Sequence, residues 1–297
     1  MLIADIAAFA AAITWAAGSL ISIGPARQLG AVAFNRIRMV VVFIMLTITA
    51  TIFGGWQTIH MEDLSMLALS GFIGIFIGDT ALFSGLSRLG PRRNSILFAT
   101  NAPISAILGY FFLLEVLNIG ALFGCGLVLA GVILSIIFGK RKDQVHQWED
   151  IHGSLTVGIG IGLLAGLCQA VGAVIAKPAL ESGADPIAVS AIRVGVAAFC
   201  LLLTMMLPGR GIKPKTRITL ALFGQITLSG FVGMGIGMSL LLFALARERT
   251  GIVMTLSSMT PVMILPILWF MTRERPAIGA TIGAVLAVIG TGLIFLD

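Results

Sequence analysis

Charge is the scarcest property of this sequence. Asp, Glu, Lys and Arg make up 11% of its 297 residues, whereas a soluble domain carries about 25%. Hydrophobic residues make up 58%, and the mean hydropathy is +1.06. Soluble enzymes, nucleic-acid-binding proteins and secreted modules all need a polar exterior, which this composition cannot supply. The sequence therefore predicts a membrane protein.

Cysteine and histidine are also rare. The three cysteines, Cys125, Cys168 and Cys200, lie inside apolar stretches without a CxxC spacing, and the three histidines lie in polar loops. We therefore expect neither a disulfide framework nor a metal site. The sequence contains no HExxH, no paired intramembrane acids and no Walker A motif, so we expect no catalytic residues, no cofactor and no ATP-driven pumping by this chain.

Ten apolar segments approach the roughly 20 residues that a helix needs to cross a bilayer. The first lacks the basic n-region of a secretory signal, so we expect it to be retained. A polar linker over residues 139–153 separates a first half (1–138) from a second half (154–297). The expected spans are residues 3–23, 31–53, 64–87, 93–114, 117–138, 154–176, 186–207, 217–246, 250–271 and 276–296.

The two halves repeat each other. A shift of 159 residues places Ser70–Gly90 on Ser229–Arg249 with identity at 9 of 21 positions, and a shift of 158 places Pro103 on Pro261. Because five spans return the chain on the opposite side, the second half must enter the membrane upside down relative to the first. The sequence therefore predicts an all-α integral membrane protein whose ten transmembrane helices form two inverted five-helix repeats.

Lys and Arg are distributed unevenly between the two faces of this arrangement. Fifteen fall on one face and three on the other, while Arg193 begins a span. Cytoplasmic loops carry an excess of Lys and Arg, so both termini are expected to face away from the cytoplasm. The net charge of +6 is thus a property of the cytoplasmic loops and does not indicate nucleic-acid binding.

Asp79 lies well inside the third expected span. An ionised carboxylate at that depth costs a few kcal/mol or more unless it is paired, hydrated or protonated. Asp79 could couple transport to a proton or cation, or it could be the counter-charge of a substrate amine. Alternatively, it forms an ion pair with an arginine such as Arg38 or Arg193 and locks two helices. Its repeat counterpart is Met238, so the repeat does not require the acid.

Pro103 and Pro261 each fall near the middle of a span, where a proline removes a backbone hydrogen bond and kinks the helix. Matched prolines in inverted repeats point to a transport site. Asn101 precedes the first proline, and Ser257 and Ser258 precede the second. The serine hydroxyls either line a site or satisfy the carbonyls that the prolines free, whereas the Asn101 amide needs several partners.

Two further polar side chains lie near mid-depth in the first and sixth spans. Trp15 either fills the core or stacks on a substrate, and Gln169 is expected to line a cavity because its amide needs a polar partner. The candidate substrate-binding residues are therefore Trp15, Asp79, Asn101, Gln169, Ser257 and Ser258, with Asp79 also the candidate coupling residue.

Several motifs occur once in each half and in the same order. An arginine opens the second span (AFNRIRM, AVSAIRV), the fourth span carries ATNAP or SSMTP, and an acidic turn follows (LLEVL, MTRERP). The last span of each half begins IGA. In these features the whole chain resembles the EamA-like, ten-span branch of the drug/metabolite transporter superfamily.

The resemblance implies a basket of helices around a central cavity, in which the third, fourth, eighth and ninth spans rock against the rest. Similar proteins export amino acids, related metabolites or drugs, and eukaryotic relatives exchange nucleotide sugars. Many members have cytoplasmic termini, so the charge distribution of this chain departs from the family expectation.

We therefore expect a secondary transporter that exports small amphipathic metabolites, with amino-acid-like solutes first, across a bacterial inner membrane. Its expected partners are a small-molecule substrate and membrane lipid, not nucleic acid; proton or cation coupling and a monomeric or homodimeric state stay open. The alternatives are a membrane enzyme or scaffold acting on lipid, and a nucleotide-sugar or drug transporter of the same superfamily. A sugar nucleotide would need several Lys or Arg side chains that point to one site at the middle of the membrane. The candidates in this sequence are Arg38, Arg193 and Lys177, and all three lie near the ends of spans.

Overall fold

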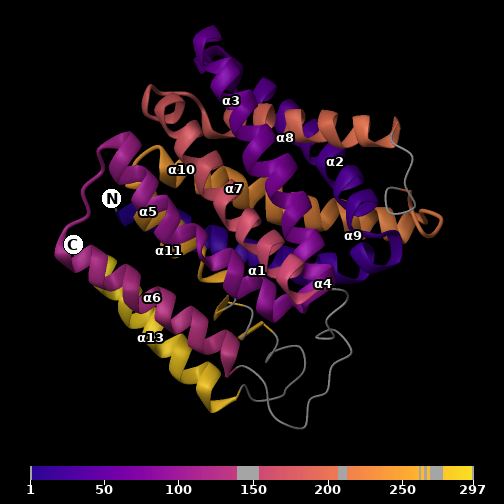
Figure 1. The fold of residues 1–297 in the computed structure, drawn as a ribbon. Coiled ribbons are helices and arrows are strands. Elements are labelled where there is room, and N and C mark those ends of the chain that lie inside the picture. The colour runs from indigo at the N-terminus through magenta and orange to yellow at the C-terminus, as the bar shows by residue number, and fades with distance from the viewer. Residues whose placement is uncertain are drawn as a thin grey trace.

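The computed structural model describes residues 2–138, 154–206, 213–260, 262–263, 266–267 and 277–295, and these form a bundle of helices (Figure 1). The first half contains α1 (Leu2–Leu29), α2 (Ala31–Ile52), α3 (Leu64–Ser70), η3 (Gly71–Ile77), α4 (Gly78–Ala99), α5 (Asn101–Leu113) and α6 (Ile119–Ile137). The second half contains α7 (Leu155–Glu181), α8 (Pro186–Leu203), α9 (Leu220–Gly230), η5 (Phe231–Ile236), α10 (Gly237–Leu245), α11 (Thr250–Ser257) and α13 (Ile278–Phe295). Short 3-10 turns add η1 (Gly55–Thr58), η2 (Met61–Asp63) and η4 (Thr204–Met206).

The lengths and composition of these helices confirm an all-helical membrane fold. Six helical segments are long and apolar enough to cross a membrane, and three shorter apolar helices accompany them. Side chains at the segment ends explain several boundaries. Asp185 accepts hydrogen bonds from the backbone of Ile187 and Ala188, and Pro186 follows it at the first position of α8, which together favour a helix start.

Helices from the two halves pack in reciprocal pairs. The second, fourth and fifth spans each pack on their repeat counterparts, through α2 with α8, α5 with α11 and α6 with α13. The first span packs on the eighth through α1 and α10, and the sixth packs on the third through α7 and α4. The two-fold axis that relates the repeats maps the contact between the first and eighth spans onto the contact between the sixth and third spans. Two inverted repeats require such matched contacts.

Glycines at equivalent positions of the two halves allow these helices to pack closely. A Cβ on Gly71 would lie 2.5 Å from the backbone oxygen of Arg193, and a Cβ on its counterpart Gly230 would lie 3.1 Å from the Arg38 side chain. Both glycines border a π-helix, η3 in the third span and η5 in the eighth. Without side chains, these segments approach the arginine-bearing helix of the opposite half directly.

Substitution of Gly71 by alanine is expected to lower the free energy of unfolding by about 1–3 kcal/mol, because the new methyl group collides with α8 backbone. Alanine at Gly126 is the matched control, since a Cβ there meets nothing within 4 Å. Thermal unfolding in detergent measures both variants. Equal melting temperatures for the two would contradict the proposed tight contact.

The chain reverses inside α4. Asn94 Nδ2 donates to the Leu82 carbonyl at 3.0 Å, although twelve residues of straight helix would separate them by about 18 Å. The third and fourth spans are therefore antiparallel, as expected. The helix of the fourth span is then interrupted at Thr100, three residues before Pro103, whereas Pro261 lies outside the described residues.

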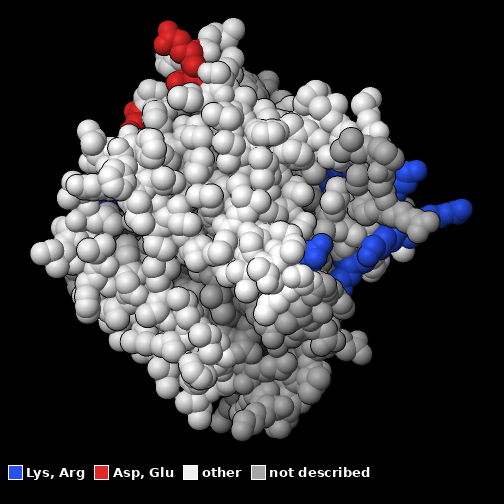
Figure 2. All heavy atoms as spheres, viewed as in Figure 1, with Lys and Arg blue, Asp and Glu red and all other residues white. Residues whose placement is uncertain are grey.

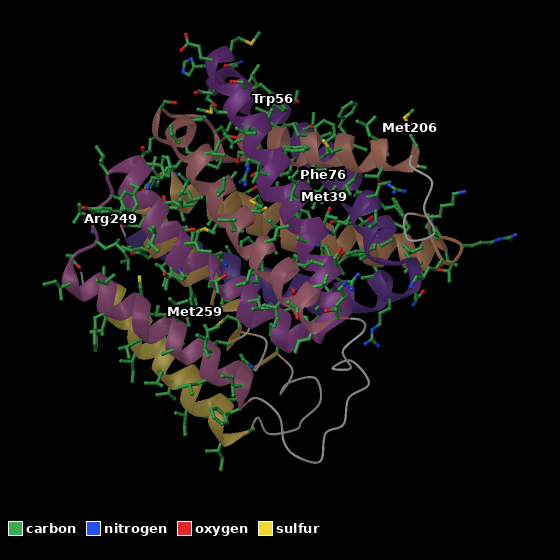
Figure 3. All side chains as sticks on the ribbon, in the orientation of Figure 1. Met39, Trp56, Phe76, Met206, Arg249 and Met259 are labelled. Atoms are coloured by element: carbon green, nitrogen blue, oxygen red, sulfur yellow. The ribbon has the colours of Figure 1, made fainter. Side chains whose placement is uncertain are left out.

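Charge separates the two ends of the bundle. Figure 2 shows Lys and Arg gathered at the end where α9 begins and Asp and Glu at the opposite end, around the start of α3. In Figure 3, Trp56 and Arg249 lie toward the acidic end and Met206 toward the basic end. The loop before α9 packs on the turn between α1 and α2, where Lys215 N–H donates to the Leu29 carbonyl at 3.1 Å.

Among the described cations assigned to the basic face, Arg36 and Arg38 are buried. Arg36 is 6% exposed and donates from Nε to the Leu201 carbonyl at 3.0 Å, near the end of α8. Arg38 is 7% exposed and lies deeper in α2. These two arginines, which open the second span, therefore bind within the bundle and do not belong to its solvated surface.

Candidate functional site

An ion pair joins the second and third spans of the first half. Arg38 Nη2 on α2 lies 3.0 Å from Asp79 Oδ2 on α4, and their side chains are 9% and 15% exposed. The guanidinium carbon of Arg38 also lies 5.0 Å from the centre of the Phe83 ring. Met39, the next residue on α2, is fully buried inside the bundle (Figure 3). The structure therefore contains an ion pair between Asp79 and an arginine, which is one of the interpretations that the sequence left open.

The equivalent place in the second half holds an arginine without a carboxylate. Arg193 Nη1 on α8 donates to the Met238 sulfur at 3.5 Å, and Arg193 is 1% exposed. Its Nε has no hydrogen-bond partner among the residues described. A Cβ on Gly74, five residues before Asp79, would lie 3.1 Å from Arg193 Nη2, so Arg193 also packs on the span that carries the acid. The cluster of Arg38, Asp79 and Arg193 carries a formal charge of about +1 when all three groups are ionised.

The interrupted helices of the fourth and ninth spans meet. Asn101 and Ser258 are 2% and 6% exposed, and the Ser258 hydroxyl lies 3.3 Å from Asn101 Oδ1. Asn101 Nδ2 donates to the Phe98 carbonyl at 2.6 Å. Ser258 Oγ also donates to the Met254 carbonyl at 2.7 Å, and Ser257 Oγ donates to the same carbonyl at 3.1 Å. The hydroxyls thus satisfy carbonyls at the helix end, and Asn101 links the two repeats.

Trp15 and Gln169 occupy equivalent places on α1 and α7. A Cβ on Gly237 would lie 2.6 Å from Trp15 Nε1, and a Cβ on Gly78 would lie 3.9 Å from the Gln169 nitrogen. Gly78 precedes Asp79, so the Gln169 backbone lies beside the residue that precedes the acid. Gln169 is 6% exposed. Its role as a cavity-lining residue stays a prediction.

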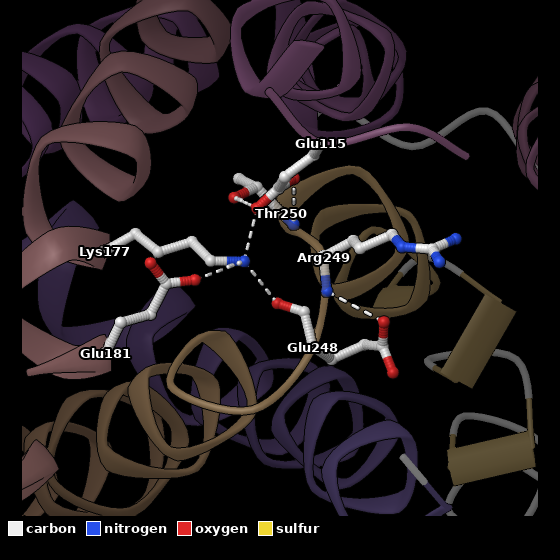
Figure 4. A network of polar contacts seen from close by, with 6 residues as sticks. All are labelled: Glu115, Lys177, Glu181, Glu248, Arg249 and Thr250. Carbon is white, nitrogen blue, oxygen red and sulfur yellow. Dashed lines mark hydrogen bonds and ion pairs between the residues drawn. The ribbon is translucent and has the colours of Figure 1, made fainter. Parts of the chain in front are cut away.

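A second polar cluster lies toward the acidic end of the bundle, around Arg249 (Figure 3 and Figure 4). Lys177 on α7 is 3% exposed, pairs with Glu115 after α5, and donates to the Glu248 carbonyl at 2.6 Å. The Glu115 carboxylate also accepts from the Thr250 backbone N–H at 2.7 Å and from the Thr250 hydroxyl at 3.0 Å. We call Glu115, Lys177, Glu248 and Thr250 the terminal cluster.

The terminal cluster connects spans that the sequence alone does not bring together. Glu115 and Lys177 belong to the fourth and sixth spans, and Glu248 and Thr250 belong to the turn between the eighth and ninth. In the sequence, Glu115 stands only as the acid of the turn LLEVL, with no partner assigned. A usable signal was present, because Lys177 is one of three cations on a face that otherwise carries acids.

Comparisons with known proteins agree with this architecture. The model of the EamA-like transporter family matches residues 2–137 and again residues 156–296. No curated protein matches the chain significantly. A crystal structure of a protein 15% identical in sequence superposes with a TM-score of 0.79 over 99% of this chain and 96% of that chain, which shows a shared fold. The two matched repeats cover nearly the whole chain, which therefore belongs to the EamA-like transporter family, multi-pass membrane transporters of the drug/metabolite transporter superfamily.

Proposed function

We propose that this protein is a secondary transporter that exports small amphipathic metabolites, amino-acid-like solutes first, across a bacterial inner membrane by alternating access. The observation that carries the proposal is the buried cluster of two arginines and one acid between the repeats, because buried ionisable residues in membrane spans mark transport pathways. A cluster with both signs of charge suits a substrate that carries both signs.

The same observation disfavours multiply anionic sugar nucleotides as substrates. Arg38 is engaged by Asp79, and Lys177 is engaged by Glu115. Arg193, unlike Arg38 and Lys177, has no carboxylate at ion-pair distance among the described residues. One such cation matches a carboxylate better than a diphosphate, which needs several donors at once.

Asp79 is proposed as the coupling residue. A proton or cation that neutralises its carboxylate weakens the attraction to Arg38, and the arginine is then free to bind a substrate carboxylate. Loss of the proton restores the ion pair and releases the substrate. Such competition links the movement of one charge to the movement of the other.

Purified protein in liposomes tests the proposal. Counterflow of labelled amino acids is expected, with accumulation that depends on a proton gradient. Empty liposomes are the control for leak, and liposomes with the Gly126→Ala variant, which is expected to fold and to transport normally, are the control for substitution itself. If no amino acid exchanges while a cationic dye does, the protein is a drug-type transporter and the proposed substrate class is wrong.

Orientation is a separate prediction. A C-terminal alkaline phosphatase fusion is expected to be active and a C-terminal green fluorescent protein fusion to be dark, because the basic loops favour the cytoplasm and both termini lie at the opposite end. Bright fluorescence with an inactive phosphatase would show that the termini are cytoplasmic, as in many family members.

A further inference from the structure

Asp5 is a second buried acid of the membrane spans, and the candidate site does not include it. It lies in the first turn of α1 and is 5% exposed. Its Oδ1 atom has no hydrogen-bond partner among the residues described, and no ion pair within that part of the chain includes its carboxylate. Asp79, in contrast, is paired with Arg38. Asp5 is therefore a buried carboxylate without the compensation that Asp79 has.

The packing of α1 on the eighth span shows what lies at the level of Asp5. A Cβ on Gly18 would lie 3.0 Å from Gly233 Cα, and a Cβ on Gly237 would lie 2.7 Å from the Thr14 hydroxyl oxygen. Four residues back along α1 thus match four residues forward along the eighth span, as in an antiparallel helix pair. Nine further residues on each side bring Asp5 level with the turn that follows α10.

That turn carries another buried acid, Glu248, which is 7% exposed. Its Oε1 accepts from the Arg249 backbone N–H at 2.8 Å, and its backbone carbonyl accepts from the Lys177 ammonium group. Lys177 is in turn paired with Glu115. The acidic end thus combines the carboxylates of Asp5, Glu115 and Glu248 with one buried ammonium group, and their formal charge is about −2 when all four are ionised.

The remaining charged groups near this level do not neutralise Asp5. Arg247 is exposed, and its guanidinium carbon lies 3.8 Å from the centre of the Phe243 ring. The Arg249 guanidinium points away from the terminal cluster (Figure 4). Four elements that pack on α1, namely α9, η5, α10 and α11, contain no Asp, Glu, Lys or Arg. The two arginines of α2 lie near its beginning, at the basic end.

Burial favours the neutral acid at this position. An ionised carboxylate that loses its hydration and gains no partner is much less stable than the protonated form, and a second carboxylate nearby adds repulsion. A metal ion needs several ligands around it, and among the described residues no group of three or more His, Cys, Asp or Glu could hold one. A proton needs only a carboxylate oxygen and no cavity.

We propose that Asp5 is a proton-binding site that is occupied while the acidic end of the bundle is closed and empties when that end opens to water. On opening, water hydrates the group, the O–H bond of the neutral acid breaks, and the proton passes to water. On closing, the carboxylate takes a proton from water again. Protons at the acidic end therefore favour its closed state.

This inference rests on the proposed alternating access and deepens it. It gives the acidic end a proton site of its own, separate from the Arg38–Asp79 pair that is proposed to bind and couple the substrate. Both sites can then respond to the same proton gradient, one through the substrate and the other through the opening of the bundle.

Asp5→Asn tests the site in the folded protein. Asparagine is neutral and similar in shape to the protonated acid, so this variant is expected to melt at least as high as the wild-type protein at neutral pH. From about pH 5 to about pH 8, the wild-type melting temperature is expected to fall by roughly 2–4 °C more than that of Asp5→Asn, because Asp5 loses its proton. Glu62→Gln, which removes an exposed acid of η2 at the same end, is expected to keep the wild-type profile.

A cysteine at position 105 measures the opening itself. Ser105 is fully buried on α5, so a maleimide reaches Ser105→Cys only when the bundle opens; the three native cysteines are first replaced by alanine. Over the same pH range, the labelling rate without Asp5→Asn, divided by the rate with it, is expected to rise about tenfold. The division cancels the titration of the thiol.

Glu248→Gln tests the influence of the neighbouring carboxylate. The amide oxygen of glutamine still accepts from the Arg249 N–H, whereas the negative charge is gone. Asp5 then holds its proton less tightly, so the rise in the ratio of labelling rates is expected to move to lower pH.

The outcomes separate the proton site from the function on which it rests. A constant ratio of labelling rates, or equal pH profiles of melting for the wild-type protein and Asp5→Asn, overturns the proton site. A lower melting temperature of Asp5→Asn at neutral pH also overturns it, because the fold would then need the ionised carboxylate. Neither measurement uses a substrate, so absence of counterflow for every amino acid overturns the proposed function and leaves the result for Asp5 valid.

Discussion

Replacement of Asp79 by asparagine is expected to abolish gradient-driven accumulation of substrate in liposomes. The amide cannot take up and release a proton, so the competition between Asp79 and the substrate carboxylate for Arg38 is lost. Counterflow, which needs no gradient, is expected to persist in the fraction of protein that folds. Accumulation and counterflow are measured on the same vesicles.

The substitution also removes one partner of a buried ion pair. Such a loss typically destabilises a protein by about 3–5 kcal/mol, because the remaining charge stays buried without compensation. A low activity of Asp79→Asn alone would therefore not separate coupling from folding. The double variant Arg38→Gln/Asp79→Asn removes both charges and is expected to recover the melting temperature.

The double variant decides between the two interpretations of Asp79. If the pair only locks α2 to α4, the neutral pair restores accumulation together with stability. If Asp79 carries the coupling proton and Arg38 binds the substrate carboxylate, stability returns, whereas accumulation does not and counterflow stays weak. Normal accumulation in Asp79→Asn would end the coupling proposal and leave the transporter assignment in place.

A third variant uses the repeat. Met238 is the counterpart of Asp79, and its sulfur accepts from Arg193. Asp79→Met/Met238→Asp therefore moves the acid from one arginine to the other without a change in net charge. If only the charge balance matters, this variant transports normally. If transport needs the acid beside Arg38, the variant folds and its KM for amino acids rises.

The fold could be predicted because a bilayer imposes a simple rule on sequence. Each span must be apolar over about 20 residues, and charge is confined to the ends. The reciprocal packing of the helices followed from the repeat, since Gly71 and Gly230 are equivalent in sequence and equivalent in contact. Interruption of the fourth span near Pro103 is a local property of proline and needs no tertiary information.

The candidate site was only partly predictable. The sequence suggested that Asp79 lies deep in the membrane and that Arg38 or Arg193 is its partner. Which of the two arginines binds it depends on how α2 and α4 cross. Lys177 and Glu115 are 62 residues apart, and their contact follows only from the packing of α5 on α7. Asn35 lies in the motif AFNRIRM near the start of the second expected span, and its burial follows only from the packing around α2.

Replacement of Lys177 by methionine is expected to open the acidic end of the bundle. The ammonium group pairs with Glu115 and donates to the Glu248 carbonyl, and so it holds the fourth span and the turn before the ninth against the sixth. Charged hydrogen bonds of this kind contribute about 1.5–3 kcal/mol, which corresponds to a shift of roughly 10- to 100-fold toward an open state.

A buried serine reports the opening. Ser105 is fully buried on α5, one helical turn from Gly109, where a Cβ would lie 2.7 Å from the Glu115 carboxylate. In a protein whose three cysteines are replaced by alanine, Ser105→Cys is expected to react slowly with an impermeant maleimide. With Lys177→Met added, the labelling rate from the acidic end is expected to rise by about the same 10- to 100-fold.

Two controls decide whether the terminal cluster acts as a gate. Glu181 also lies near Lys177, at 3.6 Å, but its side chain is 55% exposed, so Glu181→Gln is expected to change labelling less than about threefold. The exchange Glu115→Lys/Lys177→Glu keeps both charges and is still expected to open the acidic end. A lysine at position 115 cannot accept hydrogen bonds from the Thr250 N–H and hydroxyl. If Ser105→Cys is labelled as slowly in the exchange variant as in the protein without the exchange, the attraction between the two charges is enough to hold the acidic end closed. If folded Lys177→Met labels no faster, the cluster is a static cap, and the closure of this end has to be attributed to the apolar packing of α5, α7 and α11.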